Sequence, residues 1–549
     1  MTKILIVGGG YAGFTAARRL EKKLNPGEAQ VTLVDPLPYM TYQPFLPEVA
    51  GGSIEPRHAV VSHRRHLKRT RVITAEVVKI DHATKTATIA PADGDEYTLG
   101  YDIIVVTAGA VSRTFPIPGI AENAVGMKQI EEAVWVRDTM IDNFNRASTM
   151  APGPERSRLL TFVVVGGGFA GIEAFAEMRS LATSLLADYP SLQFDDVQFH
   201  LIEAAPRIMP EVSEETALWV IKNLAERGAT VHLNTQCTSA VDGVVETSNG
   251  DKFPTDVIVW TAGMMAHPLV KGFSDLPVNE RGNLRGRADL RVEGDEGIVK
   301  DAWTCGDVAA IPDLSGGGVA GYCVPNAQHA VRQAVVLADN IVATLRGDAP
   351  TDYYHENLGA VAGLGMGTGA FQSGKMAVTG FLAWGAHRGY HGMAIPTYER
   401  KIRVFVNWGL QLLLGRDFVS LAKVREPNGF FERFAARPKP AAAADTPAAG
   451  QPVADKPAAG KPVAEGPSAE KPAPSKPAVG KPVTEKPVTD KPAAGKPVAD
   501  NPAAGKPAAA KPAVNKPVAE KQPVTKPAAG AAKPDATTGA QAPDESAKA

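Results

Sequence analysis

The feature that most constrains the fold is a glycine-rich stretch that occurs twice in the chain. The first copy is ILIVGGGYAGFTAARRL at residues 4–20, and the second is VVVGGGFAGIEAFAEM at residues 163–178. In each copy a short apolar run precedes glycines at G-x-G-x-x-G spacing, and a helical pattern follows. Apolar runs of this length are typical of buried parallel strands. The sequence therefore predicts two strand–turn–helix units.

The glycines at this spacing have distinct physical roles. They are Gly8, Gly10 and Gly13 in the first copy, and Gly166, Gly168 and Gly171 in the second. The first of each set allows a tight turn, the second lets a pyrophosphate approach the backbone, and the third lets the helix pack on the strand. The N–H groups at the helix start then face the phosphates. A single copy could also be a plain strand–helix turn, so the surrounding sequence must distinguish the two interpretations.

Each half also carries an acidic residue where a dinucleotide-binding unit needs one. VTLVD ends in Asp35, 22 residues after Gly13, and VQFHLIE ends in Glu203, 32 residues after Gly171. A carboxylate at the end of the second strand accepts hydrogen bonds from ribose hydroxyls. Because the second gap is longer, we expect its crossover to hold an extra stretch, LATSLLADYPSLQFDD.

The two halves continue to match beyond the acidic residues. Each has a later strand ending in T-A-G, within YDIIVVTAGA at 101–110 and DVIVWTAGM at 256–264. This agreement in order and kind favours two dinucleotide sites over two unrelated turns. Two dinucleotides in one chain indicate that electrons pass from one to the other.

A further carboxylate stands in DAWTCGDVA at 301–309. We expect a strand to end at Gly306 and Asp307 to open a helix. A carboxylate at that place can hold the polyol chain of a flavin, whereas the alternative is an ordinary aspartate N-cap. Beside the two nucleotide motifs, we interpret Asp307 as a flavin ligand.

Composition argues against several other classes of protein. The formal net charge is −1, which gives no bias toward nucleic acid or acidic partners. Cys237, Cys305 and Cys323 are far apart in the sequence, so neither a redox disulfide nor a metal site is predicted, and each is interpreted as a small buried residue. The N-terminus lacks signal-peptide features, and we expect no segment with the ~20 apolar residues of a membrane span.

The composition changes sharply near residue 437. From Pro438 to Ala549 there is no aromatic residue, Ile, Leu, Met, Cys or Arg, and proline recurs every five residues from Pro447 to Pro517. Such a segment cannot bury enough apolar surface to offset its ordering entropy. We expect a disordered tail, partly polyproline II, which acts as a solubilising spacer or as a binding arm.

Together the motifs resemble those of a known family. They are GGGYAGF, MTYQPFLPEVAGG (40–52), GGGFAGIEA, LIEAAPRIMPE (201–211), WTCGD, VPNAQHAVRQA (324–334) and LAWGAHRGYHG (382–392). The chain resembles the flavoproteins with two dinucleotide-binding domains, and within them the type II NADH dehydrogenases, which are single-subunit NADH:quinone oxidoreductases. The resemblance covers about residues 1–425.

The resemblance implies an α/β fold with two Rossmann-like domains, the NADH domain inserted in the FAD domain. The expected parts are the first FAD part at 1–157, the NADH domain at 158–264, the second FAD part at 265–352, a C-terminal quinone and membrane-associating domain at 353–436, and the tail at 437–549.

The resemblance also implies a role for each matching residue. For FAD it implies Gly8, Gly10, Tyr11, Ala12 and Gly13 at the pyrophosphate turn, Asp35 at the adenosine ribose, Thr107, Ala108 and Gly109 at the strand end facing the flavin, and Asp307 at the ribitol. Val77 and Ala327 are further expected cofactor-binding residues. For NADH it implies Gly166, Gly168, Phe169, Ala170, Gly171, Glu203 and Gly263. Glu173 matches a catalytic carboxylate beside the nicotinamide, although a glutamate in the first turn of a helix is also favoured by the helix dipole alone.

The expected quinone motif departs from the family pattern A-Q-x-A-x-Q. Ala327, Gln328 and Ala330 fit this pattern, but Arg332 takes the place of the second glutamine, and Gln333 follows it. On a helix, positions 328 and 332 share a face, whereas 333 is rotated away. Gln328 is therefore the predicted quinone ligand with a catalytic role, Arg332 is either a second ligand or a surface charge, and Gln333 is a further candidate for the quinone site. His329 is interpreted as an ordinary helix residue rather than a catalyst.

A quinone lies in a bilayer, so the enzyme must reach one. Residues 377–415 hold the apolar runs AVTGFLAWG and IRVFVNWGLQLLLG, bounded by His387, Arg388, Arg400, Lys401, Arg403 and Arg416. We expect a helix or helix pair in the interface, with tryptophan and basic residues at headgroup depth. The alternative is a core or dimer-contact helix. The expected protein is a homodimer, peripheral on the cytoplasmic face of the cell membrane, and it pumps no protons directly.

Three other functions are compatible with parts of this sequence. A sulfide:quinone reductase would need Cys305 and Cys323 as a pair by the flavin, and the complete second nucleotide motif argues against it. A soluble ferredoxin or rubredoxin reductase is disfavoured by the interfacial segment. A non-catalytic tethering protein would act through the tail.

Overall fold

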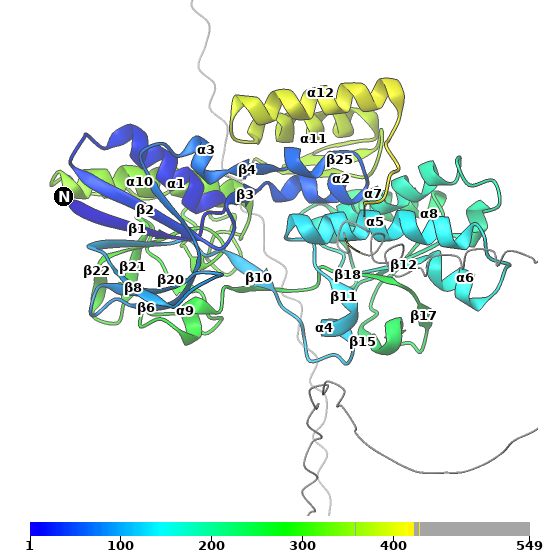
Figure 1. Ribbon diagram of the computed structural model, residues 1–549, viewed down its shortest axis with the longest axis horizontal. Coiled ribbons are helices and arrows are strands. Elements are labelled where there is room, and N and C mark those ends of the chain that lie inside the picture. The colour runs from blue at the N-terminus through cyan, green and yellow to red at the C-terminus, as the bar shows by residue number, and fades with distance from the viewer. Residues whose placement is uncertain (357, 422–427, 429–549) are drawn as a thin grey trace, which may run out of the picture. The chain divides into compact units, whose positions relative to one another are not determined.

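Two parallel sheets, each built on one copy of the glycine-rich unit, organise the chain (Figure 1). The structure is a computed structural model, and it describes residues 1–356, 358–421 and 428. The residues predicted to form the tail, 437–549, lie outside the described part.

The first sheet surrounds the N-terminal glycine motif. Its strands, in spatial order, are β21 (Arg291–Gly294), β22 (Gly297–Thr304), β9 (Ile103–Val106), β1 (Thr2–Val7), β2 (Ala29–Asp35) and β5 (Arg71–Thr74). The strands run parallel except β21, which pairs antiparallel with β22. Helices α1 (Tyr11–Lys23) and α10 (Ala327–Leu345) pack against each other, and the antiparallel strands β6 (Glu76–Asp81), β7 (Thr86–Ala90) and β8 (Tyr97–Gly100) lie on the other side (Figure 1).

The second sheet repeats this plan around the second glycine motif. Its strands, all parallel, are β11 (Ala124–Val125), β18 (Val257–Trp260), β12 (Thr161–Val165), β13 (Gln198–Ile202) and β14 (Ala229–His232). Helices α5 (Ile130–Ala147) and α7 (Phe169–Leu185) pack beside it. All its strands lie in sequence between β9 and β21 of the first sheet, so the second unit is inserted in the first. The α/β fold is as expected, and the domain boundaries at 157, 264, 352 and 436 stay predictions.

A smaller C-terminal part follows α10. It consists of the antiparallel strands β24 (Ala360–Gly363), β25 (Gly369–Ser373) and β26 (Met376–Thr379), and the helices α11 (Phe381–Ala394) and α12 (Tyr398–Leu414). A threonine hydroxyl at Thr397 caps α12 by accepting the backbone N–H of Arg400. The expected helix pair in 377–415 is therefore present. None of the helices in the described residues has the length and apolarity needed to cross a membrane.

Buried ion pairs attach this C-terminal part to the nucleotide-binding units. The Arg388 guanidinium of α11 lies 3.2 Å from the carboxylate of Glu48 in α2 (Leu46–Ala50), and the indole N–H of Trp408 in α12 donates to the same carboxylate at 2.9 Å. The guanidinium also lies over the Trp384 and Trp408 rings, 4.5 and 5.0 Å from their centroids. Burial raises the pKa of Glu48, and the Arg388 charge opposes this shift.

This arrangement corrects one expectation from the sequence. His387, Arg388 and Arg416 were expected at headgroup depth with the tryptophans, but their side chains are buried, as are Trp384 and Trp408. The reason is that carboxylates far away in the sequence face them: Glu48, Glu173 and Glu177. A charge inside the protein needs such a partner, because an unpaired buried charge is very costly.

The Glu48–Arg388 pair predicts a specific pattern of stability. Arg388→Met leaves Glu48 buried without its counter-charge, so we expect a loss of roughly 3–5 kcal/mol in the free energy of unfolding. The double variant Glu48→Gln/Arg388→Met should recover most of that loss, since no buried charge remains and the Gln amide oxygen can still accept from Trp408. Denaturant unfolding followed by tryptophan fluorescence measures both. A double variant no more stable than the single one would show that the pair acts through packing, not charge.

Candidate functional site

The first glycine turn has the geometry that its sequence predicts. Gly8 has φ +93°, and a Cβ atom there would lie 2.6 Å from the carbonyl oxygen of Thr107. A Cβ at Gly13 would lie 1.8 Å from the carbonyl oxygen of Gly8. Gly10, in contrast, has no neighbour within 4 Å of its Cβ position. Two of the glycines therefore permit the fold itself, while Gly10 leaves open space in front of the start of α1.

The second turn repeats these contacts almost atom for atom. Gly166 has φ +111°, and a Cβ at Gly171 would lie 1.9 Å from the carbonyl oxygen of Gly166. The Cβ position of Gly168 again meets nothing within 4 Å. Both units thus bring a helix N-terminus against the strand and keep the space before it free.

The two acidic residues hold the same position in their units. Asp35 accepts the N–H of Gly9 at 2.5 Å through one oxygen and the N–H of Leu37 at 2.7 Å through the other. Glu203 accepts the N–H of Gly167 at 2.5 Å and of Ala205 at 2.7 Å in the same way. Burial raises the pKa of Asp35, and these N–H groups oppose that shift. Each carboxylate is fixed at the end of the second strand, where ribose hydroxyls are bound.

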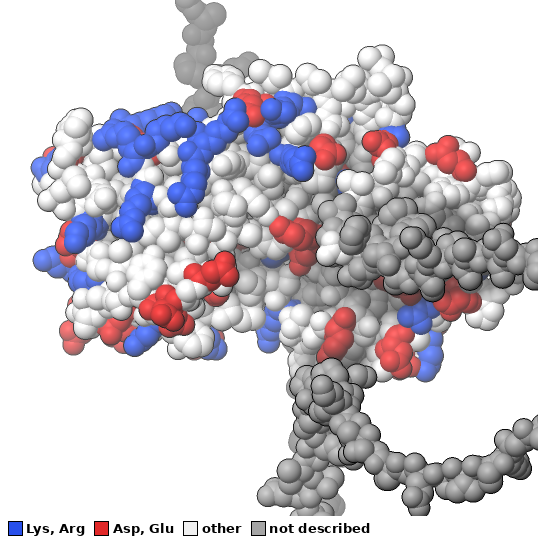
Figure 2. All heavy atoms as spheres, viewed as in Figure 1, with Lys and Arg blue, Asp and Glu red and all other residues white. Residues whose placement is uncertain are grey.

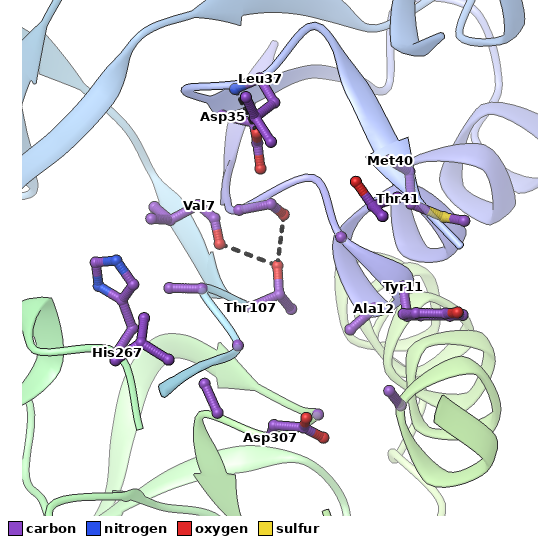
Figure 3. Close-up of a pocket in the computed structure, with 18 of the residues that line it drawn as sticks. Val7, Tyr11, Ala12, Asp35, Leu37, Met40, Thr41, Thr107, His267 and Asp307 are labelled. Carbon is purple, nitrogen blue, oxygen red and sulfur yellow. Dashed lines mark hydrogen bonds between the residues drawn. The ribbon is translucent and has the colours of Figure 1, made fainter. Parts of the chain in front are cut away.

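The threonine of each T-A-G ties the turn to the neighbouring strand. The Thr107 hydroxyl donates to the carbonyl oxygens of Val7 (3.0 Å) and Gly8 (2.9 Å), as Figure 3 shows. The Thr261 hydroxyl donates to those of Val165 (3.0 Å) and Gly166 (3.1 Å). In each unit, one threonine hydroxyl therefore holds two carbonyl groups: that of the first glycine of the motif and that of the valine before it.

A cavity of about 270 Å³ opens in front of the first turn (Figure 3). Eleven of the predicted cofactor residues line it: Gly8, Gly10, Tyr11, Ala12, Asp35, Val77, Thr107, Ala108, Gly109, Asp307 and Ala327. In Figure 3, Asp35 and Asp307 lie on opposite sides of it, with Thr107 between them. The structure thus brings together residues spread over more than three hundred positions of the sequence.

Asp307 lies in a turn, not at a helix start. Strand β22 ends at Thr304, Gly306 has φ +76°, and the next helix, α10, begins only at Ala327. The expectation that Asp307 opens a helix is therefore wrong, and with it the interpretation as an N-cap. Burial raises the pKa of Asp307, and the nearby Lys128 ammonium opposes the shift. Asp307 lines the cavity, where its carboxylate can meet a ligand.

The residues that line the cavity have the chemistry and the spatial order that FAD needs. Gly10 leaves room for a pyrophosphate before the N-terminus of α1, Asp35 stands where a ribose is held, and Asp307 lies across the cavity. The Tyr11 side chain also lines the cavity, and burial raises the pKa of its hydroxyl well above the ordinary value.

Glu173 lies between the second unit and the C-terminal part. One of its oxygens accepts the N–H of Gly363 at 2.9 Å and lies 3.1 Å from Nε2 of His387. Burial lowers the pKa of His387, but Glu173 and the charges of Glu48 and Glu177 outweigh it, so the pKa is raised. Helix α7 has no acidic residue in its first turn, so the interpretation of Glu173 as a dipole-favoured first-turn residue is wrong.

The residues predicted to bind the quinone all lie on α10, but they differ in burial and in hydrogen-bond partners. The Gln333 side chain is buried and accepts the N–H of Gly306 at 2.9 Å, so it holds the turn that carries Asp307. Gln328 is half-buried, and Arg332 donates to its backbone carbonyl at 3.1 Å. His329 contacts the Tyr353 hydroxyl through Nδ1 at 2.9 Å, which agrees with a structural role in the helix.

Sequence reasoning missed several residues of the cavity. Lys128, His267 and Cys305 line it, together with Met40 and Thr41. Met40 and Thr41 stand in the quoted stretch MTYQPFLPEVAGG, so the family motif pointed to their segment without naming them. Lys128 and His267 carry no motif, and only the fold brings them to the site.

Comparison with known proteins agrees with this geometry. Residues 2–334 match the model of the family "Pyridine nucleotide-disulphide oxidoreductase", and the chain belongs to that family. It is 28% identical to the type II NADH:quinone oxidoreductase NdhA of Mycobacterium tuberculosis, over 75% of this chain and 87% of that one. It is 29% identical to the type II NADH:quinone oxidoreductase of Staphylococcus epidermidis, over 67% and 88% respectively.

A solved structure shows the same fold. It is NDH2 from Plasmodium falciparum in complex with NADH, with a TM-score of 0.69 and 19% identity over 76% of this chain and 99% of that one. The predicted resemblance to the type II NADH dehydrogenases is confirmed by the two sequence relatives, and the solved structure shows the same fold.

The two threonines predict separable defects. Thr107→Val removes the hydroxyl that ties the Gly8 carbonyl of the FAD-type turn to the neighbouring strand, at a cost of about 1–3 kcal/mol, while the Val7 carbonyl still accepts the backbone N–H of residue 107. We expect the purified variant to hold less flavin. Thr261→Val is the matched change in the second unit, and it should keep its flavin while the KM for NADH rises roughly 5- to 30-fold. Flavin absorbance per protein and steady-state kinetics measure the two effects, and the opposite pattern would reverse the assignment of the units.

Proposed function

We propose that the protein is a non-proton-pumping, FAD-dependent NADH:quinone oxidoreductase. One observation carries this proposal: the same strand, glycine turn and bound carboxylate occur twice, and one copy opens into a cavity with Asp35 and Asp307 on opposite sides. FAD belongs in the first unit and NADH in the second. Relatives named type II NADH:quinone oxidoreductases support a quinone as the electron acceptor.

The protein's own groups bind and orient in this scheme. Bound FAD supplies the redox chemistry, by taking a hydride from NADH and passing two electrons to a quinone. The N–H groups around Gly10 and Gly168 face the two pyrophosphates, and Asp35 and Glu203 hold the riboses. The Glu203 carboxylate also disfavours a 2′-phosphate, so NADH is preferred to NADPH.

The roles near the reacting rings extend this proposal. Glu173 is fixed by Gly363 and His387 at the junction with the C-terminal part. We propose that its carboxylate lies beside the nicotinamide of bound NADH. Gln328 is the proposed quinone ligand. Arg332 shares its helix face and is its proposed companion. The contact of Gln333 with Gly306 supports a positioning role for Gln333 behind Asp307 rather than a direct one.

The cysteines argue against a sulfide:quinone reductase. All three are free. Burial raises the pKa of the Cys305 thiol, and it raises that of Cys323 to about 11. A sulfide-handling site needs reactive thiolates, and these thiols stay protonated near neutral pH.

An exposed apolar surface supports the proposed membrane contact. On α11 and α12 the large apolar residues with exposed side chains are Phe381, Leu382, Met393, Ile402, Phe405, Val406, Leu410, Leu412, Leu413 and Leu414. Large exposed apolar surfaces mark membrane or protein interfaces. We propose that this apolar surface rests on the cytoplasmic face of the cell membrane. We also propose that the protein is a homodimer. The alternative to membrane contact is that part of the same apolar surface forms the contact between the two subunits.

Anaerobic mixing tests the proposed reaction directly. We expect NADH to bleach the flavin absorbance of the purified full chain, and a short-chain quinone to restore it. Neither sulfide as donor nor oxidised ferredoxin as acceptor should replace these reactants at a comparable rate. Failure of NADH to bleach the flavin would refute the enzyme class, and reoxidation by ferredoxin but not by quinone would favour the soluble reductase.

The membrane contact makes its own prediction. Trp408 is buried, so the informative change is at the exposed leucines, Leu412 (64% exposed) and Leu413 (81%). Each such side chain contributes on the order of 1.5–3 kcal/mol when buried in the interface. Leu412→Glu/Leu413→Glu should therefore release the protein from membranes while NADH still bleaches the flavin.

A matched control separates this effect from general damage. Leu218 and Phe273 are also exposed apolar residues, and they lie outside α11 and α12. Leu218→Glu/Phe273→Glu should leave membrane binding unchanged. If the α12 variant stays bound and instead loses its dimer in sedimentation, the apolar surface is a subunit contact.

A further inference from the structure

The segment from Pro56 to Ala75 carries charge of one sign only. It holds six arginine or lysine residues and three histidines, and it contains no aspartate or glutamate. The segment forms the short helix η2 (Pro56–His58), β4 (Val60–Ser62), α3 (His63–His66) and β5. It lies outside both glycine turns, and it lies outside residues 377–415.

Contacts hold this segment beside α12. The Asn407 side chain of α12 accepts the N–H of Glu55 at 3.1 Å and contacts Nδ1 of His58 at 3.2 Å. The Arg65 guanidinium of the segment lies 3.0 Å from the Glu399 carboxylate in the first turn of α12. The basic segment and the exposed apolar surface of α12 are therefore neighbours in the folded unit.

Most of this charge is not neutralised by the protein. Arg57, Arg64, Arg65, Lys68 and Arg69, here called the basic surface, are all exposed. The acidic groups that touch it are Glu399, which Arg403 also binds, and Glu21, which accepts backbone N–H groups of residues 69 and 70. Arg57, Arg64 and Lys68 form no ion pair with any described residue.

Figure 2 shows the same imbalance on the surface. Lys and Arg gather over the region of α1 and α3, and α12 carries charged residues only near its start, with none after Arg403. Lys22 of α1 is also exposed and adds to this side. An apolar helix beside a patch of unpaired cations is the combination that holds a protein on a negatively charged bilayer, since each signal alone binds weakly.

We propose that the basic surface binds the headgroups of anionic phospholipids and sets the protein on the membrane together with the apolar side of α12. This inference rests on the proposed membrane contact and adds the lipid class to it. Two other partners fit less well. The predicted tail carries 16 lysines against 11 acidic residues, so it is not complementary in charge. Nucleic acid would leave the adjoining apolar surface of α12 exposed.

Vesicle flotation of the full chain tests the proposal. The vesicles are phosphatidylcholine alone, or an equimolar mixture with phosphatidylglycerol, at low and high salt. The test variant Arg57→Gln/Arg64→Gln/Lys68→Gln removes the three unpaired charges. Each basic residue near an anionic surface changes binding roughly fivefold, so partitioning onto the mixed vesicles should fall on the order of 100-fold. Binding to phosphatidylcholine alone should not change.

A control variant removes the same charge from another place. Lys79 in β6, Lys271 in α9 (Leu269–Gly272) and Arg281 are exposed, and β6 and α9 lie on the other side of the first sheet from α1 (Figure 1). Lys79→Gln/Lys271→Gln/Arg281→Gln should bind mixed vesicles like the unchanged protein. Flavin content and NADH oxidation by a water-soluble quinone should stay normal in both variants.

The possible outcomes distinguish the role of the basic surface from the proposed membrane contact and from the proposed reaction. Equal losses in the two triple variants, or equal binding of the unchanged protein to both vesicles at low salt, would overturn the role of the basic surface while leaving the apolar contact intact. Absence of binding to either vesicle by the unchanged protein would overturn both the membrane contact and this inference. Tighter binding to duplex DNA than to mixed vesicles would assign the basic surface to nucleic acid. None of these results changes the reaction with NADH.

Discussion

The close approach of a helix to a strand, made possible by one glycine, is the contact on which the rest of this structure depends. At Gly13 and at Gly171 a single added carbon would lie within 1.9 Å of a carbonyl oxygen. Without that approach α1 and α7 could not point their N-termini over the strand ends. The carboxylates of Asp35 and Glu203 then close each turn from the other side by accepting a glycine N–H. Two copies of this turn are the basis for the two proposed nucleotide sites in one chain.

The C-terminal part depends on a different interaction, the burial of charge. Carboxylates at Glu48, Glu173 and Glu177 belong to the nucleotide-binding units, and their partners His387, Arg388 and Arg416 belong to the C-terminal part. Buried pairs of this kind add little net stability but fix geometry, because a misplaced partner leaves an uncompensated charge. The pairs therefore set the position of α11 and α12 against the second glycine unit. One of them also immobilises Glu173 beside the proposed nicotinamide site.

The features that could be predicted from the sequence are those set by contacts within one glycine-rich unit. Glycine spacing, the acidic residues at strand ends and the T-A-G strands describe contacts within a unit, so Gly8, Asp35 and Thr107 were predictable. Lys128 and His267 reach the cavity only through the path of the whole chain. Asp307 was predicted as a ligand but in the wrong local structure, because a strand followed by glycine and aspartate does not distinguish a turn from a helix start. The basic and aromatic residues of 377–415 were assigned to headgroups because their buried partners are more than two hundred positions away.

The central claim is that two dinucleotides bind side by side to two copies of one unit. An experimental structure of the flavin-loaded chain with NADH, determined at a resolution that shows both ring systems, tests it most directly. The account predicts the flavin in the first unit, with its pyrophosphate at the N–H groups around Gly10 and its polyol chain at Asp307. It predicts NADH in the second unit, with its adenosine ribose on Glu203. A flavin bound in the second unit, or a single dinucleotide serving both turns, would contradict it.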